Sequence, residues 1–461
     1  MSERTEVILE GTFQQNDQGR FVALPFDVPP HIGRVDVHLE FSDKTGTEPW
    51  ETEGNALDIG IFDPRENDDP RKGFRGWSGS ARMDFSIDGD TATPGYISGP
   101  IQQGTWHILL GLFKIWHKGC DYKLTITLTH DVPNNTPAEF PIQLPLRTEA
   151  KREASATGWY KGDLHCHSFH SDGDSDPINV VKEAERLGLD FLAVTDHNTL
   201  SHQVALNTID TEVMLIPGVE ITTFSGHWNI WGDFDWIDFR VDSAEKMDAT
   251  IQEANRRGYL TSCNHPRPNG PAWKFENVES FNCIEVWNSP WLIEHNHHCL
   301  SFWETRLNQG KRFVAVGGSD NHELKNAAES HLGQATTYIY CDGEISPARL
   351  LQALRAGHAF VTCAPDGPQI YLLSGTAMMG DSILRPSNNQ LKLQIEVLRG
   401  DGGQLEVCTA KGVSESILIT GNQTKLELEV DIKDTSYVRV QLRRLEDNSM
   451  LVLSNPIYLD D

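Results

Sequence analysis

Histidine and carboxylate residues follow most of the apolar runs in the middle of the chain. The first run leads into DLHCHSFHSDG, which supplies His165, His167 and Asp172. Because successive side chains of a strand point to opposite faces, the two histidines of an HxH pair face the same side and can hold one ion. Later runs end in further candidates: Asp196, His197, Glu220, His227, His265, Asp320 and His322. A mixture of imidazole and carboxylate suits Zn²⁺, Mn²⁺ or Fe²⁺ better than Ca²⁺ or Mg²⁺.

The segment 158–364 carries the elements that must position these side chains. Three stretches that each open with a capping residue and close at a glycine, 177–188, 242–258 and 346–357, predict helices. Between them lie apolar runs such as DFLAVTD and RFVAVGGSD, and this alternation predicts a parallel α/β barrel or sheet. In a barrel the carboxyl ends of the strands meet on one face. A single histidine at a strand end is usually structural, so it is the repetition over several strand ends that predicts a metal site.

The flanking segments are predicted to be all-β, so the fold class is multidomain α/β plus all-β. Residues 1–135 contain short alternating runs separated by turn residues, which is typical of a β-sandwich or jelly roll. Within them, residues 73–85 (GFRGWSGSARMDF) are interpreted as a long ordered loop. Residues 136–157 carry prolines and then a charged, alanine-rich run, and are predicted to be a linker. Residues 365–461 return to alternating runs and predict a C-terminal β-sandwich.

The charge balance restricts the partners. Thirty-nine basic and 66 acidic residues give a formal net charge of −27, which disfavours long nucleic acids and anionic membranes as partners. Bound cations would reverse the sign locally, so a small anionic or ester substrate remains allowed. The sequence shows no signal-peptide pattern and no apolar run near the roughly 20 residues of a membrane-spanning helix. The eight cysteines form no CxxC pair, which favours reduced thiols and a cytoplasmic location.

Five segments resemble, in the same order, the motifs of the PHP (polymerase and histidinol phosphatase) domain: DLHCHSFHSDG, VTDHN, PGVEIT, NHP and GSDNH. Four further segments resemble the CehA/McbA branch of that superfamily: GIFDPR, GFRGWSGS, GVEITTFSGHWNIWG and the tail SNPIYL. The resemblance implies a distorted (β/α)7 barrel with two or three divalent ions. The ligands that it implies are His165, His167, Asp172, His197, Glu220, His227, His265, Asp320 and His322. It places Asp196 behind them, where a carboxylate would orient a ligand or water.

Other residues near the candidate ligands have two interpretations each. Arg267 follows His265 and Pro266, and its guanidinium could hold a phosphoryl oxygen, although a surface role is equally consistent with this proline-rich loop. His295, His297 and His298 lie in a predicted helical stretch, where one of them could reach the pocket as a proton donor, although a solvent-facing role is favoured. Five tryptophans either wall a pocket or pack a domain interface, and packing is favoured: Trp228, Trp231, Trp236, Trp287 and Trp291.

The leading functional hypothesis is hydrolysis of a small phosphomonoester or phosphodiester by metal-activated water. It rests mainly on the PHP resemblance, with manganese, zinc or iron as the expected ions. The first alternative is a carbamate or carboxylic ester hydrolase of the carbaryl-hydrolase type, because the same metal hydroxide would attack a carbonyl carbon. The alternative from another class is a carbohydrate-binding module with an incidental metal site, which the complete ligand set argues against.

Overall fold

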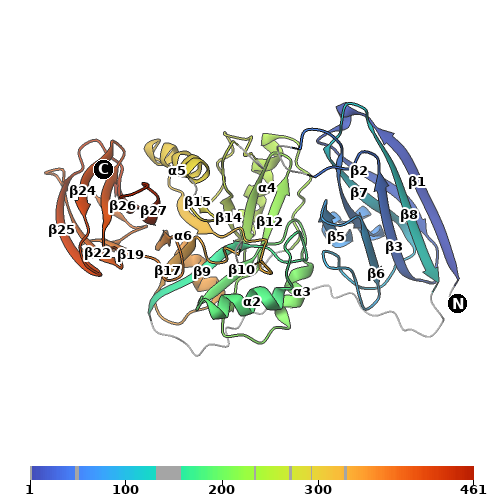
Figure 1. Cartoon of the computed structure of the whole chain (residues 1–461), viewed down its shortest axis with the longest axis horizontal. Coiled ribbons are helices and arrows are strands. Elements are labelled where there is room, and N and C mark those ends of the chain that lie inside the picture. Colours follow the sequence, from blue (N-terminus) through green and yellow to red (C-terminus); the bar gives the residue numbers. More distant parts are fainter. Residues whose placement is uncertain are drawn as a thin grey trace.

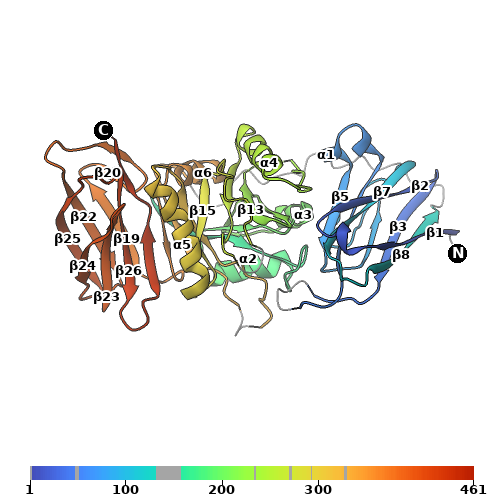
Figure 2. The ribbon, with the colours of Figure 1, turned by 90° about the horizontal axis from the view of Figure 1, so that it is seen from above.

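The computed structural model describes residues 3–46, 51–130, 157–232, 235–268, 272–291, 293–326 and 330–460. It shows three parts in a row, with the N-terminal strands at one end and the C-terminal strands at the other (Figures 1 and 2). Most of the helices lie in the middle part. The predicted linker at 136–157 lies outside the described residues except for its last residue, and the domain boundaries stay predictions.

Two four-stranded antiparallel sheets form the N-terminal part, here called the N-terminal β-domain (residues 3–130). One contains β1 (Arg4–Phe13), β8 (Cys120–His130), β3 (Ile32–Phe41) and β6 (Asp84–Asp88). The other contains β2 (Phe21–Val28), β7 (Gly104–Lys114), β4 (Ala56–Phe62) and β5 (Phe74–Gly79). A shared apolar core includes the fully buried side chains of Val35, Ile59, Trp106 and Ile126. Short helical turns follow β1 and β4: η1 (Gln15–Asp17), η2 (Pro64–Asn67) and α1 (Pro70–Gly73).

The prediction of a long loop at 73–85 was wrong, because this stretch forms β5 and the start of β6. Gly76 adopts φ +141° and pairs closely with the segment around Tyr96, where a Cβ would lie 2.5 Å from the Tyr96 Cα. Arg75 is fully buried and donates to the carbonyl oxygens of Ile97 and Gly99. The glycines that suggest a loop in the sequence therefore allow close packing of strands.

The middle part contains two mixed sheets. The first includes β11 (Met214–Leu215), β10 (Phe191–Val194), β9 (Gly158–Cys166), β17 (Thr336–Cys341) and β18 (Ala359–Thr362). The second contains β12 (Gly218–Thr223), β13 (Gly226–Trp231), β14 (Leu260–Cys263), β15 (Cys283–Asn288) and β16 (Val314–Gly318). Pairing is parallel in β9–β10–β11 and in β14–β15–β16, whereas β13 and β17 run antiparallel to their neighbours. The closed (β/α)7 barrel stays a prediction.

Five helices accompany these strands: α2 (Pro177–Arg186), α3 (Ser201–Asn207), α4 (Ala244–Arg256), α5 (Ile293–Asn308) and α6 (Pro347–Arg355). The three predicted helices are confirmed as α2, α4 and α6. Their N-caps are Asp176, Ser243 and Ser346, whose side chains accept backbone N–H bonds in the first turn. In the described part of the chain no helix has the length and apolarity needed to cross a membrane.

The C-terminal part continues the first sheet of the middle part, because β18 pairs with β27 (Met450–Ser454). From there the sheet extends through β26 (Tyr437–Arg444), β23 (Gly403–Thr409) and β24 (Gly412–Leu418), with β28 (Ile457–Asp460) and β21 (Ser382–Leu384) beside it. A four-stranded sheet faces it across an apolar core: β20 (Ala377–Met378), β19 (Gln369–Ser374), β22 (Gln390–Leu398) and β25 (Gln423–Asp431).

Aromatic side chains join the N-terminal β-domain to the middle part. Phe74 stacks on Trp236 with ring centroids 4.8 Å apart, and Phe21 stacks on Phe224 at the same distance. Trp228, Trp231, Trp236 and Trp287 are almost fully buried, which supports the packing interpretation for these tryptophans. This interface places β4 and β5 against the segment that follows β13.

Candidate metal centre

The HxH pair lies at the carboxyl end of β9. His165 is within the strand, and His167 follows its last residue. Their Nε2 atoms lie 3.2 Å and 3.1 Å from Oδ1 of Asp320, which follows β16 by two residues. The backbone bridge between Cys166 and Asn321 joins the two sheets at this point. Two strands from different sheets therefore bring imidazole and carboxylate to one place.

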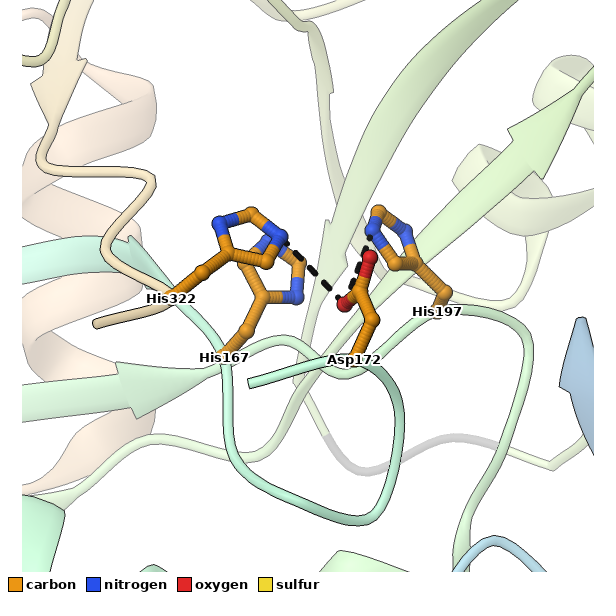
Figure 3. Close-up of side chains that lie close together, drawn as sticks. All are labelled: His167, Asp172, His197 and His322. Atoms are coloured by element: carbon orange, nitrogen blue, oxygen red, sulfur yellow. Dashed lines mark ion pairs between the residues drawn. The ribbon is translucent and has the colours of Figure 1, made fainter. Parts of the chain in front are cut away.

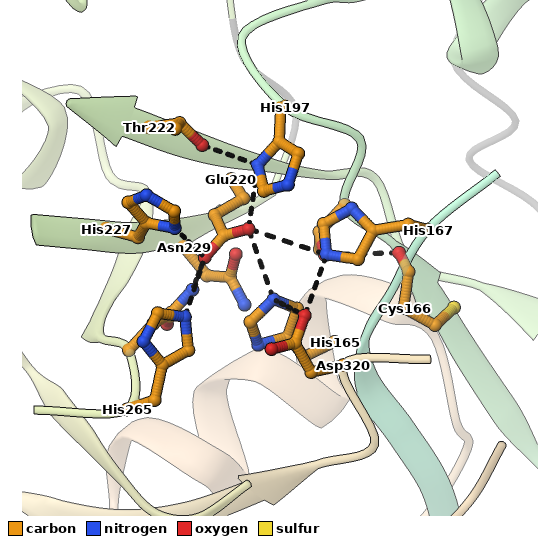
Figure 4. A network of polar contacts seen from close by, with 12 residues as sticks. His165, Cys166, His167, His197, Glu220, Thr222, His227, Asn229, His265 and Asp320 are labelled. Atoms are coloured by element: carbon orange, nitrogen blue, oxygen red, sulfur yellow. Dashed lines mark hydrogen bonds and ion pairs between the residues drawn. The ribbon is translucent and has the colours of Figure 1, made fainter. Parts of the chain in front are cut away.

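Glu220, a fully buried residue of β12, lies at the centre of the site (Figure 4). Five imidazoles surround its carboxylate at 3.0 to 3.4 Å. Those facing Oε2 are His165, His167 and His197, and those facing Oε1 are His227 and His265. His227 is at the start of β13, the antiparallel return strand of a tight hairpin, which explains its short spacing from Glu220. A carboxylate with imidazoles on both oxygens has the geometry of a bridging ligand.

A second group surrounds Asp172, on the loop after β9 (Figure 3). Its Oδ1 lies 3.5 Å from Nε2 of His197 and 3.3 Å from Nε2 of His322. The rings of His167 and His322 stack with centroids 4.1 Å apart. All nine predicted ligands thus belong to one connected cluster.

The side chains fit divalent ions. Three overlapping groups have ligand atoms within 4.8 Å of one another: His167/Asp172/His197/His322, His165/His167/Glu220/Asp320 and His197/Glu220/His227. Atoms that each lie about 2.1 Å from one ion are about 3 to 3.5 Å from each other, and the nitrogen–oxygen distances reported above agree with this spacing. Nε2 of His165 and Oε2 of Glu220 are buried and form no hydrogen bond with the described residues. Buried acceptors without donors are the expected environment for a cation.

The cluster shifts the pKa values of its own members. Burial raises the pKa of Glu220, but the charges of His165, His197 and His227 lower it well below its usual value. The pKa of Asp320 falls well below normal by the same balance of burial against imidazole charge, and the charges of His197 and His322 outweigh desolvation and lower the pKa of Asp172 well below normal. Burial lowers the pKa of His167 to about 4, whereas Asp172 outweighs burial and raises the pKa of His322 to about 9. Near neutral pH a metal ion would therefore compete with a proton at His322 more than at His167.

Asp196 lies directly behind the ligands. Its Oδ1 accepts from the backbone N of Ser168 at 2.8 Å and from Oγ of Ser171 at 2.6 Å, while Oδ2 accepts from Oγ of Ser168 at 2.6 Å. Oδ2 is also 3.6 Å from Nδ1 of His202. Asp196 therefore fixes the loop that connects His167 to Asp172.

Sequence reasoning missed several residues that orient the ligands. Oε1 of Glu285, in β15, lies 2.9 Å from Nδ1 of His165, and Oε2 accepts from the backbone N of His265. Asn264 donates to Oε1 of Glu220 at 2.9 Å. Asp163 accepts backbone N–H bonds from His165 and Ser319. A charged or amide residue within a buried apolar run is the sequence signal that could have found Glu285 and Asp163.

Arg267 is half-buried, two residues after His265. Its Nη1 lies 3.3 Å from Nδ1 of His295, a half-buried residue at the start of α5. Nε of Arg267 is buried and has no hydrogen-bond partner among the described residues. The guanidinium of Arg267 therefore keeps one donor, Nε, that no described residue accepts.

Residues 163–261 match the family model of the PHP domain, so the chain contains a PHP domain that begins at the strand carrying the HxH pair. An uncharacterized protein of Methanocaldococcus jannaschii is 29% identical over 119 residues, which cover 23% of this chain and 67% of that protein. A 5'-3' exoribonuclease of Haemophilus influenzae is 40% identical over 65 residues, or 14% of this chain. The match spans only 24% of the length of the exoribonuclease.

Solved structures with low overall similarity include a two-domain protein from Bacteroides vulgatus that contains a predicted PHP-like metal-dependent phosphoesterase. It is 17% identical, with a TM-score of 0.35, and the alignment covers 67% of this chain and 99% of that chain. An amidohydrolase from Chromobacterium violaceum with bound sulfate and no metal is 16% identical, with a TM-score of 0.27 over 37% of this chain and 89% of that one. TM-scores this low do not define a common architecture.

Proposed function

We propose that this chain is a metal-dependent hydrolase that cleaves a phosphoester bond of a small substrate. The observation that carries the proposal is the position of Glu220, whose two carboxylate oxygens face five imidazoles, four of which take part in overlapping ligand groups. Such an arrangement suits two or three neighbouring ions, the number typical of phosphoester chemistry. The PHP domain match over residues 163–261 supports the same class of reaction.

The proposed residue roles follow from the contacts. Glu220 would bridge ions, and Asp172 would complete a further site with His197 and His322. When bound, divalent ions supply positive charge and acidify water, which are the two requirements of ester hydrolysis. Asp196 would keep the loop of Asp172 in place. Arg267 would bind a non-bridging phosphoryl oxygen through its guanidinium, whose Nε has no hydrogen-bond partner among the described residues.

The substrate proposed is small and anionic. The formal net charge of −27 repels a long polyanion, whereas a few bound cations and Arg267 attract one phosphate group over short distances. A phosphomonoester, a dinucleotide or a short oligonucleotide satisfies these limits.

The test is a substrate panel with metal-reconstituted protein. Chelator-treated protein is loaded with Mn²⁺, Zn²⁺ or Fe²⁺ and assayed on an aryl phosphate, an aryl phosphodiester, an aryl carbamate and an aryl acetate. We expect turnover of a phosphoester and a loss of about 100-fold or more in Glu220→Gln, with no loss in Glu253→Gln, which changes an exposed carboxylate of α4. Turnover of the carbon esters alone would make this chain a carboxylic or carbamic ester hydrolase. No metal uptake and no turnover would favour a binding module.

A further inference from the structure

The loop between His167 and Asp172 carries a ligand candidate without support from a strand or helix. Asp172 has an exposed side chain, with 44% of its surface accessible, and its carboxylate contacts the imidazoles of His197 and His322. Its position therefore depends on the course of the loop backbone. Asp196 holds one side of this loop through Ser168 and Ser171.

The other side of the loop is held from the N-terminal β-domain. Arg82, between β5 and β6, donates through Nη1 to the carbonyl oxygen of Ser171 at 3.1 Å. Its Nη2 donates to the carbonyl oxygen of Phe169. A third bond, from Nη1 to the carbonyl oxygen of Pro94 at 3.4 Å, ties the same guanidinium to its own domain. One half-buried arginine thus connects two carbonyl groups of the loop to a neighbouring domain.

A second contact lies beside the first. The carbonyl oxygen of Gly95 accepts from Oγ1 of Thr199 at 2.7 Å, and the backbone N–H of Gly95 donates to Oγ of Ser201 at 3.0 Å. Nδ1 of His170 lies 2.8 Å from the same Ser201 hydroxyl. A Cβ at Gly95, where φ is +99°, would lie 2.9 Å from the carbonyl oxygen of His170. Figures 1 and 2 both show β5 on the side of the domain that faces α3.

We propose that Arg82 is a positioning residue for the metal centre: by binding the loop carbonyls of Phe169 and Ser171, it fixes Asp172 where an ion needs it. The N-terminal β-domain is then part of the active site and not only an attached module. The inference rests on the proposed metal site but not on the proposed reaction. Loop carbonyls that are bound by a charged donor lose conformational freedom before any ion binds. The entropic cost of ordering Asp172 is then not subtracted from the free energy of cation binding.

The experiment measures Mn²⁺ binding to chelator-treated full-length protein by calorimetry. Arg82→Met keeps the aliphatic stem but removes the donors, and we expect about 10-fold or greater weakening of one Mn²⁺ site with the remaining site unchanged. Arg82→Lys keeps a charge and can reach one carbonyl, so a smaller weakening is expected. Arg34→Met removes a multiply hydrogen-bonded arginine of β3, whose partners Asp36 and Asp88 lie in the same domain, and serves as the matched control.

A double-mutant cycle separates positioning from general loosening. In an Asp172→Asn background, Arg82→Met should weaken Mn²⁺ binding no further. The proposal is overturned if Arg82→Met binds Mn²⁺ as the wild type does, or if it causes the same additional loss in the Asp172→Asn background. Should Arg82→Met fail to fold, Arg82→Lys decides: weaker Mn²⁺ binding at an unchanged melting temperature supports the proposal, and unchanged binding overturns it. Absence of Mn²⁺ binding in the wild type would refute the proposed metal site itself.

Discussion

His165 and Glu285 form a buried pair in which Nδ1 of the imidazole lies 2.9 Å from Oε1 of the carboxylate. The other ring nitrogen of His165 then faces Glu220 and Asp320. A carboxylate on the far nitrogen fixes the tautomer and the ring orientation of a metal-binding histidine. Glu285 also accepts from the backbone N of His265, so one carboxylate orients two ligands.

The first prediction concerns this pair. Glu285→Gln keeps the shape but removes the charge that makes His165 a better ligand, and should weaken Mn²⁺ binding about 10-fold. Glu285→Ala removes the acceptor as well and should cost more, up to about 100-fold. Calorimetric titration of chelator-treated protein measures both. Glu253→Gln is the control. Equal Mn²⁺ affinity in the wild type, the two Glu285 variants and the control would show that Glu285 does not support metal binding.

The second prediction concerns the close packing behind His165. A Cβ at Gly318, the last residue of β16, would lie 2.4 Å from Cβ of His165 and 3.1 Å from Oε1 of Glu285. Gly318→Ala should therefore displace His165, reduce Mn²⁺ uptake and lower the free energy of unfolding by about 1 to 3 kcal/mol. Gly89→Ala is the matched control, because a Cβ there meets no atom within 4 Å. Normal metal content in Gly318→Ala would show that the strand can move aside at no cost to the site.

The third prediction concerns Asp58, a partly buried carboxyl of β4 near the metal centre. Burial raises its pKa to about 7, against the opposing charge of His197. As the pH rises from 4 to 7, Asp58 loses its proton in the unfolded chain before it does so in the folded chain. The free energy of unfolding therefore falls progressively over this range, and the loss is complete above pH 7. In chelator, Asp58→Asn should melt about 2 to 4 °C above the wild type at pH 8 and at the same temperature near pH 4. A lower melting temperature at pH 8 would mean that the ionised carboxylate stabilises the fold.

The fourth prediction separates substrate binding from metal binding. Arg267→Met should reduce kcat/KM on an aryl phosphate about 10- to 100-fold, because a charged hydrogen bond to the phosphoryl group is lost. Mn²⁺ affinity should not change, since Arg267 lies against His295 and outside the three ligand groups. Steady-state kinetics and calorimetry on the same preparation test both parts. Equal losses on a neutral aryl acetate would point to a structural role for this arginine.

The ligands were accessible to sequence reasoning because most of them follow a short apolar run. Apolar runs lead to His167, Glu220 and Asp320. Once the carboxyl ends of the strands are assumed to converge, these side chains are predicted to form one site. Helix starts were equally accessible, since capping and proline signals are local: Asp176 caps α2 beside Pro177.

Non-local relationships were not accessible. The pairing of β18 with β27 joins residues about 90 positions apart, so no local pattern indicates that the C-terminal strands continue a sheet of the middle part. Arg82 gave no signal as a site residue, because its role arises from contacts with a loop that is distant in the sequence. The glycines in 73–85 indicate a loop when the sequence is taken alone. The structure shows that Gly76 permits close packing against Gly95 and Tyr96.

The central claim is tested most directly by the metal content of protein reconstituted with Mn²⁺. Elemental analysis counts the ions per chain in the wild type and in Glu220→Gln. If the imidazoles around Glu220 hold cations together with this carboxylate, the wild type retains two or three ions and Glu220→Gln loses at least one. Less than one ion per wild-type chain after reconstitution would contradict the assignment of this cluster as a metal centre.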